Sequence, residues 1–146
     1  MTLADCVKAR GLNDHLRAGL KALGPDSARV TVARPRRATH SVALDEALKA
    51  DLPHAPRWDY GIGLTAEGRE HVAWVEVHTA TSSEVEAVLK KLAWLKQWLA
   101  DGQDVCAQSV RSFHWVATDA GVHIDSARRR RLNAAGLRMP QSHLRL

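Results

Sequence analysis

The stretch from Tyr60 to Val77 constrains the fold of this chain more than any other segment. Residues 60–64 alternate apolar side chains with glycine, and residues 72–77 are rich in residues that favour β-strands. The segment between them is mostly polar and contains Gly68, which can supply the positive φ that a tight turn needs. The sequence therefore predicts a β-hairpin over residues 60–77.

Helical and strand patterns surround this hairpin. Periodicity and capping residues predict helices over about 3–23 (with a break near Gly11), 41–52, 83–100 (ended by Gly102) and 126–136. Shorter apolar runs predict strands at 29–33, 106–117 and 122–124, the last two joined by a tight turn at 119–121. This order predicts a single α/β domain over residues 1–146, in which helices pack on a sheet. The predicted domain divides into an N-terminal helix and strand (1–40), a nuclease-like core (41–118) and a basic C-terminal helix and tail (126–146).

The chain carries a formal net charge of +5, a surplus that favours polyanionic partners, nucleic acid above all. Arginines gather at two places in the sequence, and we expect them to contact a nucleic-acid backbone there: Arg34, Arg36 and Arg37, and Arg128, Arg129, Arg130 and Arg131. The alternative is that both groups are simply solvated surface.

Features of the two cysteines and of the N-terminus predict where the protein resides. Cys6 and Cys106 lie far apart and show no metal-ligand spacing, so we expect free thiols in a reducing compartment. The first residues carry charges where a signal peptide would be apolar, and no segment is long and apolar enough to span a bilayer. The expectation is a soluble, cytoplasmic protein with no membrane partner.

Hairpin parity places two acidic residues together. If the turn is symmetric about residues 67 and 68, paired residues have numbers that sum to 135, so Asp59 lies opposite Glu76. Directly opposed carboxylates repel each other, and a bound Mg²⁺ or Mn²⁺ would remove that repulsion. Gly61 and Gly63 leave the same face bare for a ligand, and His78 lies beside the predicted ion. A turn with one more bulged residue would instead point Asp59 away from Glu76.

A second interpretation of the same residues needs no ligand. Asp59 then begins a strand, Glu76 pairs with an arginine, and His78 ends its strand by bonding to the backbone.

Residues 41–113 resemble the PD-(D/E)XK phosphodiesterase superfamily, whose restriction-endonuclease-like fold is a central mixed sheet with a β-hairpin flanked by helices. Its pattern is a helix, a hairpin that carries Asp and then Glu-X-Lys, a long helix and a further strand. The resemblance implies that Asp59 and Glu76 bind Mg²⁺, and it places His78 where the family has lysine. Trp58, and no proline, precedes Asp59.

The family also suggests further site residues. Its lysine sometimes comes from the following helix, where Lys91 flanks the apolar stripe while Lys90 lies opposite to it. An acidic residue of the first helix can join the site, here Asp45 or Glu46. The resemblance therefore implies that His78 or Lys91 orients the attacking water.

The two tryptophans at positions 94 and 98 lie on one side of the predicted long helix. They fit either a second core layer beneath the N-terminal helix or, as an exposed aromatic patch, a homodimer contact. The eight histidines lack the paired spacings of structural zinc sites, and the chain has no phosphate-binding glycine loop and no nucleophile elbow.

Together these patterns predict a metal-dependent nuclease-like domain that hydrolyses phosphodiester bonds in nucleic acid. The alternative is a catalytically degenerate nucleic-acid-binding or protein-interaction module of the same fold.

Overall fold

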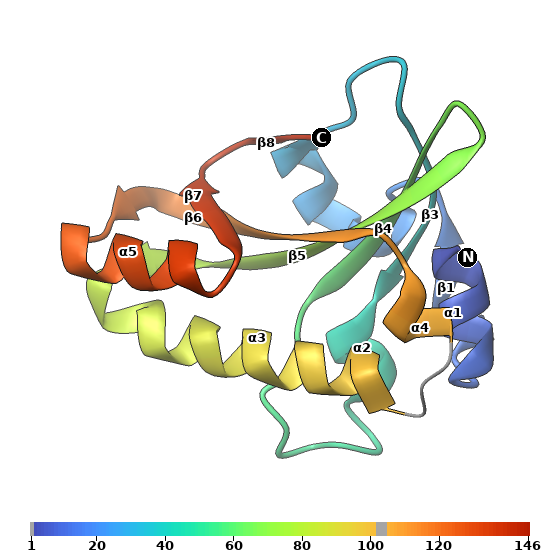
Figure 1. Cartoon of the computed structure of the whole chain (residues 1–146), viewed down its shortest axis with the longest axis horizontal. Helices are drawn as coiled ribbons and strands as arrows, with labels where there is room; N and C mark the ends of the chain where they lie inside the picture. Colours follow the sequence, from blue (N-terminus) through green and yellow to red (C-terminus); the bar gives the residue numbers. More distant parts are fainter. Residues whose placement is uncertain (1, 102–104) are drawn as a thin grey trace.

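The structure is a computed structural model, and it describes residues 2–101 and 105–146. Within these residues the fold is mixed α/β: a central mixed sheet flanked by helices (Figure 1). The sheet has six strands, in the order β1 (Leu16–Ala18), β3 (Arg37–Ala43), β4 (Tyr60–Ala66), β5 (Arg69–Thr81), β6 (Arg111–His123) and β7 (Leu137–Gln141). Two short strands, β2 (Val30–Thr31) and β8 (Leu144–Arg145), pair in parallel beside it.

Helices and 3₁₀ turns connect these strands. The α-helices are α1 (Leu3–Ala9), α2 (Leu44–Leu48), α3 (Val85–Ala100), α4 (Val105–Gln108) and α5 (Ser126–Ala134). The 3₁₀ segments are η1 (Asn13–His15), η2 (Lys21–Arg29) and η3 (Ser82–Glu84). The pairs β1–β3, β3–β4 and β4–β5 are antiparallel, whereas β5–β6 and β6–β7 are parallel and are connected by crossovers through α3 and α5.

The predicted hairpin is confirmed in position and register. Tyr60 pairs with Val75 and Gly61 with Trp74, so paired numbers sum to 135 as expected. Glu67 and Gly68 form the turn with positive φ values of 53° and 75°, the two-residue geometry that matches the twist of antiparallel strands. The register therefore sends Trp74, Glu76 and His78 to one face of the sheet.

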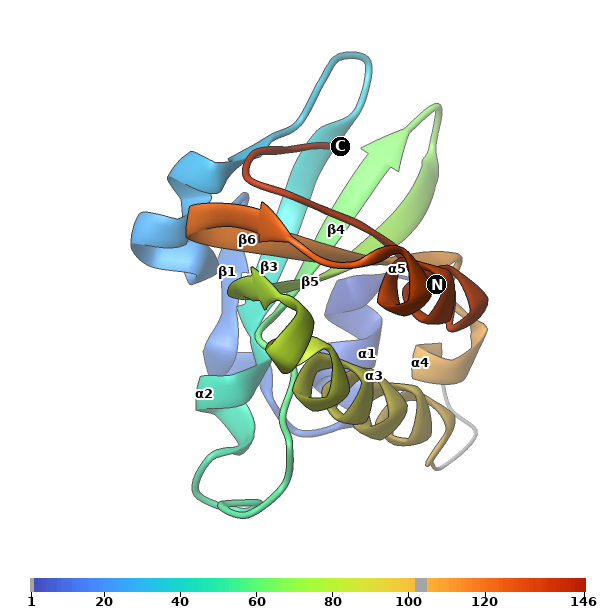
Figure 2. The same ribbon diagram turned by 90° about the vertical axis from the view of Figure 1, so that its left-hand side faces the viewer.

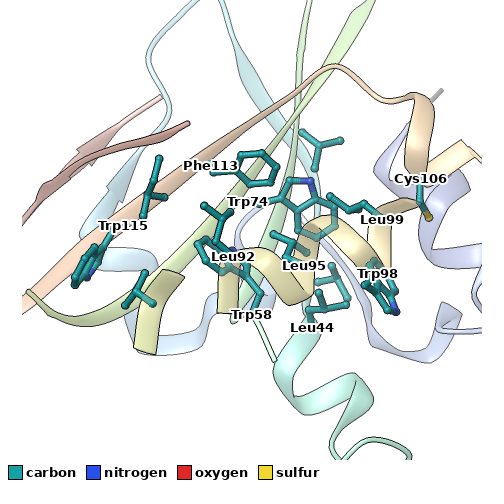
Figure 3. Close-up of a cluster of buried hydrophobic side chains, with 14 of the residues drawn as sticks. Leu44, Trp58, Trp74, Leu92, Leu95, Trp98, Leu99, Cys106, Phe113 and Trp115 are labelled. Atoms are coloured by element: carbon teal, nitrogen blue, oxygen red, sulfur yellow. The ribbon is translucent and has the colours of Figure 1, made fainter. Parts of the chain in front are cut away.

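Each face of the sheet is covered by its own hydrophobic cluster. The larger cluster joins the sheet to α1, α3, α4 and α5, and Figure 2 shows α1 and α3 on the same side of the sheet. The tryptophans and leucines of this cluster pack against one another beside α3 (Figure 3). The smaller cluster lies on the other face, where residues of η2, β2 and β8 contact the sheet. These two layers define an α3 face and an η2 face of the molecule.

The predicted long helix is confirmed, because α3 follows η3 and reaches Ala100. Its apolar stripe, which includes Val88, Leu92 and Leu95, is buried against the sheet. The predicted stop at residue 102 lies outside the described residues.

The prediction for the N-terminal third is wrong after the first helix. The α1 helix ends at Ala9, Gly11 has a positive φ of 69°, and residues 13–29 form η1, β1 and η2 instead of a continuing helix. The predicted strand at 29–33 is only the two-residue β2. Ser41 does not cap a helix: it lies inside β3, and its hydroxyl accepts a hydrogen bond from the Ala22 amide, so the following helix α2 starts at Leu44.

The predicted second hairpin is also wrong. Residues 105–108 form α4, and β6 extends to His123. It pairs with β5 in parallel on both sides of a register shift, since Ala117 lies opposite His78 and Val122 opposite Ala80. Gly121 keeps a positive φ of 77° inside this strand. The C-terminal helix is confirmed as α5, although Asp125, not Ser126, caps it, and the expected tail contains β7 and β8.

The expectation of free thiols is wrong as well, because Cys6 and Cys106 form a disulfide. The fold brings α1 and α4 together, so that the two Cα atoms lie 4.7 Å apart across 100 residues of sequence. Sequence spacing could not show this proximity. No helix among the described residues is long and apolar enough to cross a membrane.

Candidate functional site

Asp59 and Glu76 lie side by side at the start of β4. The Asp59 amide donates a hydrogen bond of 3.1 Å to Glu76 Oε1, and Asp59 Oδ2 accepts one of 2.9 Å from the Val77 amide. Each carboxylate thus accepts a hydrogen bond from a backbone amide of the opposite segment of the hairpin. These two bonds continue the pairing of the two segments beyond the first residue of β4. The predicted juxtaposition of the two acidic side chains is confirmed.

Lys91 reaches this pair from α3. Its ammonium donates a hydrogen bond to Glu76 Oε2, and the same nitrogen lies 4.0 Å from Asp59 Oδ1. The Glu76 side chain has no exposed surface, so this contact neutralises a fully buried carboxylate. The prediction that Lys91 is nearer to the site than Lys90 is confirmed, because Lys90 is exposed.

His78 completes the cluster on the same face of β5. Its Nδ1 lies 3.3 Å from Glu76 Oε2, and its Nε2 lies 3.1 Å from Glu84 Oε2. The imidazole therefore bridges two carboxylates. Glu84, in η3, was not predicted from the sequence, since only the tertiary fold brings the start of the helix back over the end of β5.

Burial and charge shift the acid–base behaviour of this cluster. The pKa of Asp59 is raised to about 7. Burial is the largest cause, the adjacent Glu76 carboxylate adds to the rise, and Lys91 opposes it. The hydrogen bond that His78 donates to Glu76 raises the pKa of His78 above its usual value, although partial burial acts against this. Near neutral pH the site can therefore exchange protons at both residues.

The two acidic candidates of the first helix differ in position. Asp45, in α2, forms an ion pair of 2.9 Å with Arg57 Nε, and its amide bonds to the Asp59 carbonyl oxygen over 3.4 Å. Asp45 therefore contacts Asp59 through its backbone amide, while its carboxylate pairs with Arg57. Glu46 is exposed on the helix, and among the described residues no hydrogen bond or ion pair joins it to the cluster.

The expectation that Gly61 and Gly63 leave a bare face is wrong. A Cβ atom on Gly61 would lie 2.6 Å from Cζ3 of Trp74, whose ring covers this glycine. A Cβ atom on Gly63 would lie 2.6 Å from Oε1 of Glu70. The glycines make room for neighbouring side chains of the protein itself, so any ligand must approach from the end of the hairpin, where Asp59 lies.

The predicted arginine groups lie on different sides of the sheet. The arginines at 34, 36 and 37 are exposed beside β2 and line a hollow with Val32 and Ala38, which belong to the η2 face. The second group sits on α5, which packs against the α3 face through Leu132. Three arginines of this group are already engaged: Arg128 with Asp125, Arg129 with the Ile124 carbonyl and Arg131 with Glu86. Arg130 is exposed.

The tryptophans of α3 take part in the core, as the first of the two interpretations predicted. Trp98 is buried and meets Trp74 edge to face, with ring centroids 6.3 Å apart (Figure 3). Trp94 stacks on Trp98, and the guanidinium of Arg10 lies 4.4 Å from the Trp98 ring centroid. Trp94 remains partly exposed, and a homodimer through this pair stays a prediction.

The donor set for a metal ion is small. Asp59 and Glu76 supply the oxygen ligands that Mg²⁺ and Mn²⁺ favour, but Lys91 already bonds to Glu76 Oε2 and lies close to Asp59 Oδ1. The described residues contain no group of three or more His, Cys, Asp or Glu that could hold a metal ion. A cation at this site would therefore need two protein ligands, coordinated water, and a displaced Lys91 side chain.

Comparison of the chain with protein-family models, with curated proteins and with solved structures finds no match.

Proposed function

We propose that this chain is a metal-dependent nuclease-like domain that hydrolyses phosphodiester bonds in nucleic acid, with a core of the restriction-endonuclease-like type. The observation that carries the proposal is the convergence of Asp59, Glu76 and Lys91 at one end of the hairpin. The order of elements also agrees with the PD-(D/E)XK pattern, since β4, β5, α3 and β6 follow one another and Lys91 comes from the helix after the hairpin.

The residues present fit an ion of the Mg²⁺ class if Lys91 moves. Asp59 Oδ1 and Glu76 Oε2 would hold it, and the long, flexible lysine stem allows the ammonium to withdraw to a coordinated water. Bound there, the ion would lower the pKa of a water and stabilise negative charge on the phosphate.

The chain's own residues have separate tasks in this proposal. Lys91 orients the water, and His78 accepts its proton once the imidazole is neutral and its Nε2 has turned away from Glu84. The raised pKa of Asp59 means that cation binding releases a proton from this carboxyl near neutral pH, so affinity for the ion rises with pH.

A degenerate binding module of the same fold is the second candidate, and one contact favours it. The Lys91 ammonium already neutralises the buried Glu76, which removes the repulsion that a metal ion would otherwise relieve. In this second candidate function, Asp59, Glu76 and Lys91 form a structural ion-pair network, and nucleic acid binds through the arginines.

The experiment that separates the two candidates is a Mn²⁺ titration at pH 8 with the melting temperature as the readout. Binding to the native state must raise the melting temperature, by an amount that corresponds to about 2.7 kcal/mol at one hundred times the dissociation constant. We expect this rise in the wild type and its loss in Asp59→Asn, and we expect Mn²⁺-dependent cleavage of single- or double-stranded DNA or RNA that EDTA abolishes.

Glu46→Gln is the matched control, because it removes an exposed carboxylate outside the cluster. It should leave the Mn²⁺ effect intact. An unchanged melting temperature in the wild type, or an equal rise in Asp59→Asn, would dispose of the metal-dependent enzyme and leave the binding module.

A further inference from the structure

A chain of hydrogen bonds crosses the η2 face of the sheet, away from the acidic cluster. His71 Nε2 lies 2.7 Å from Ser112 Oγ, and the same oxygen lies 2.6 Å from His114 Nε2. These residues have the opposite parity to Trp74 and Glu76 on β5 and to Phe113 on β6, so they lie on the other side of the sheet. Two imidazoles on adjacent strands thus share one serine hydroxyl.

Each histidine lines a separate hollow with arginines. His71 lies in a hollow of about 250 Å³ with Arg36 and Arg69. His114 lies in a hollow of about 200 Å³ with Arg138 and Arg145, and the β6–β7 register places Arg138 directly beside it. Two pockets of similar lining therefore flank Ser112.

The arginines of both hollows lack acidic partners. In the described ranges 2–101 and 105–146, no carboxylate forms an ion pair with Arg36, Arg69, Arg138 or Arg145. Glu70 borders the first hollow, but its two oxygens accept hydrogen bonds from the Leu3 amide and the Thr39 hydroxyl. The first hollow therefore holds one carboxylate beside its two arginines, whereas no carboxylate is among the described side chains that line the second.

The two histidines respond to the charge of these arginines. Burial, together with the charges of Arg138, His71 and Arg36, lowers the pKa of His114 to about 4. Burial and the same two arginines also lower the pKa of His71. Both imidazoles are therefore neutral at pH 7, and each has a single N–H. The Ser112 hydroxyl donates to one of them and accepts from the other, so one of the two imidazoles keeps its N–H for an anion.

We propose that this surface, built on His71, Ser112 and His114 between four unpaired arginines, binds phosphate groups. Planar guanidinium groups match phosphate oxygens in pairs of hydrogen bonds, and one of the two neutral imidazoles supplies a further donor. The pairing of two hollows favours a ligand with more than one phosphate.

The phosphate groups that bind here belong either to a small phosphate compound or to the backbone of a nucleic-acid strand. The site lies on the opposite face from Asp59 and needs no metal ion. The proposal is therefore independent of the proposed nuclease function, and it can be tested in the presence of EDTA.

The test follows the histidine side-chain signals of the full chain by NMR at pH 7 and constant ionic strength. Inorganic phosphate and a single-stranded oligonucleotide are titrated separately against sodium chloride. We expect saturable shifts of His71 and His114, with the apparent dissociation constant raised about tenfold in Arg138→Ala, the typical effect of losing a charge-assisted hydrogen bond.

Arg130→Ala is the matched control, because it removes an exposed arginine from α5 on the other face. It should leave the affinity unchanged, and unaltered melting temperatures show that both variants fold. A response to phosphate as strong as to the oligonucleotide identifies a small phosphate as the source, and a much tighter response to the oligonucleotide identifies a strand. Absence of saturable shifts with both ligands, or equal weakening in Arg130→Ala and Arg138→Ala, overturns the proposal.

Discussion

Glu76 is the residue on which the candidate site depends, because it is a fully buried carboxylate inside a strand. Three groups satisfy it: the Asp59 amide, the Lys91 ammonium and the His78 imidazole. Burying a charge is tolerated only when partners of this kind replace the lost water. Any substitution that removes one of them tests whether the network is structural, catalytic or both.

Lys91→Met should destabilise the fold by about 3 kcal/mol, because it leaves the Glu76 carboxylate buried without its cation. Urea unfolding at pH 7 measures this change. Lys90→Met, a substitution of the same type at an exposed position on the same helix, should change the free energy of unfolding by less than about 0.5 kcal/mol. Equal effects of the two substitutions would contradict the described contact.

The raised pKa of Asp59 predicts a pH dependence with a definite sign. The folded state binds more protons than the unfolded state between the ordinary pKa of 3.8 and the folded value of about 7, so stability falls as pH rises through this window. Asp59→Asn removes this contribution. The stability of the wild type relative to the variant should therefore fall by roughly 3 kcal/mol between pH 4 and pH 8.

The lowered pKa of His114 acts in the opposite direction, because it costs stability as pH falls from 6.5 towards about 4. This residue is present in both proteins, so the comparison of wild type with Asp59→Asn cancels its effect. Urea unfolding curves at intervals of one pH unit provide the measurement. A difference between the two proteins that does not change with pH would show that Asp59 ionises normally in the folded state.

At the scale of elements, the hairpin depends on the contact between Gly61 and the Trp74 ring. A Cβ atom at position 61 would lie 2.6 Å from Cζ3 and 2.9 Å from Cε3 of this buried indole, which cannot move freely among its neighbours. Gly61→Ala should therefore destabilise the protein by about 2 kcal/mol, the typical cost of overpacking a core.

A double-mutant cycle with Trp74→Leu checks the cause. The smaller side chain removes the clash, so the alanine should cost much less in the Trp74→Leu background than in the wild type. Additive effects would mean that the glycine matters for its backbone and not for its closeness to the tryptophan. Unfolding by urea gives all four free energies.

The elements that were predicted correctly are those with strong local signals. The hairpin has alternation and a glycine turn, and α3 has an apolar stripe four turns long, so both follow from neighbouring residues alone. Residues 13–29 have no such signal, and the contact that places them, from Ser41 to the Ala22 amide, joins distant segments. The unbroken β6 was missed because its second half is a strand only through pairing with β5.

The same distinction holds for the candidate site. Asp59, Glu76 and Lys91 could be placed together from strand parity and a helical wheel, since they lie on adjacent elements. The chain from His71 through Ser112 to His114 could not be, because it requires the parallel register of β5 with β6. That register was not part of the predicted fold.

At the scale of the whole molecule, the sheet separates two chemistries. The α3 face holds the acidic cluster with its single lysine, and the η2 face holds unpaired arginines around two neutral histidines. Part of the net charge of +5 therefore lies on the face that α3 does not cover, where Arg36, Arg69, Arg138 and Arg145 line the two hollows. A polyanion should meet the protein first on this η2 face.

The disulfide between Cys6 and Cys106 ties α1 to α4 and closes a loop of 100 residues, most of the chain. Such a crosslink restricts the unfolded chain, and for a loop of this length it should contribute about 4 kcal/mol to stability. It also removes the argument for a cytoplasmic location that rested on free thiols, since disulfides persist mainly in oxidising compartments.

Reduction of the wild type should therefore lower the free energy of unfolding by about 4 kcal/mol, measured by urea unfolding with and without dithiothreitol. The double variant Cys6→Ala/Cys106→Ala is the control. Its free energy of unfolding should equal that of the reduced wild type, apart from the cost of replacing two buried sulfur atoms. Addition of reductant should not change this free energy. Because α1 also lies against β3 and β4, we expect the sheet to persist in the reduced protein. The contacts of His71, His114 and Lys91 can then be measured in the reduced protein as well. A wild type that is indifferent to dithiothreitol would show that the two sulfurs are not bonded in solution, and the expectation of free thiols would then be restored.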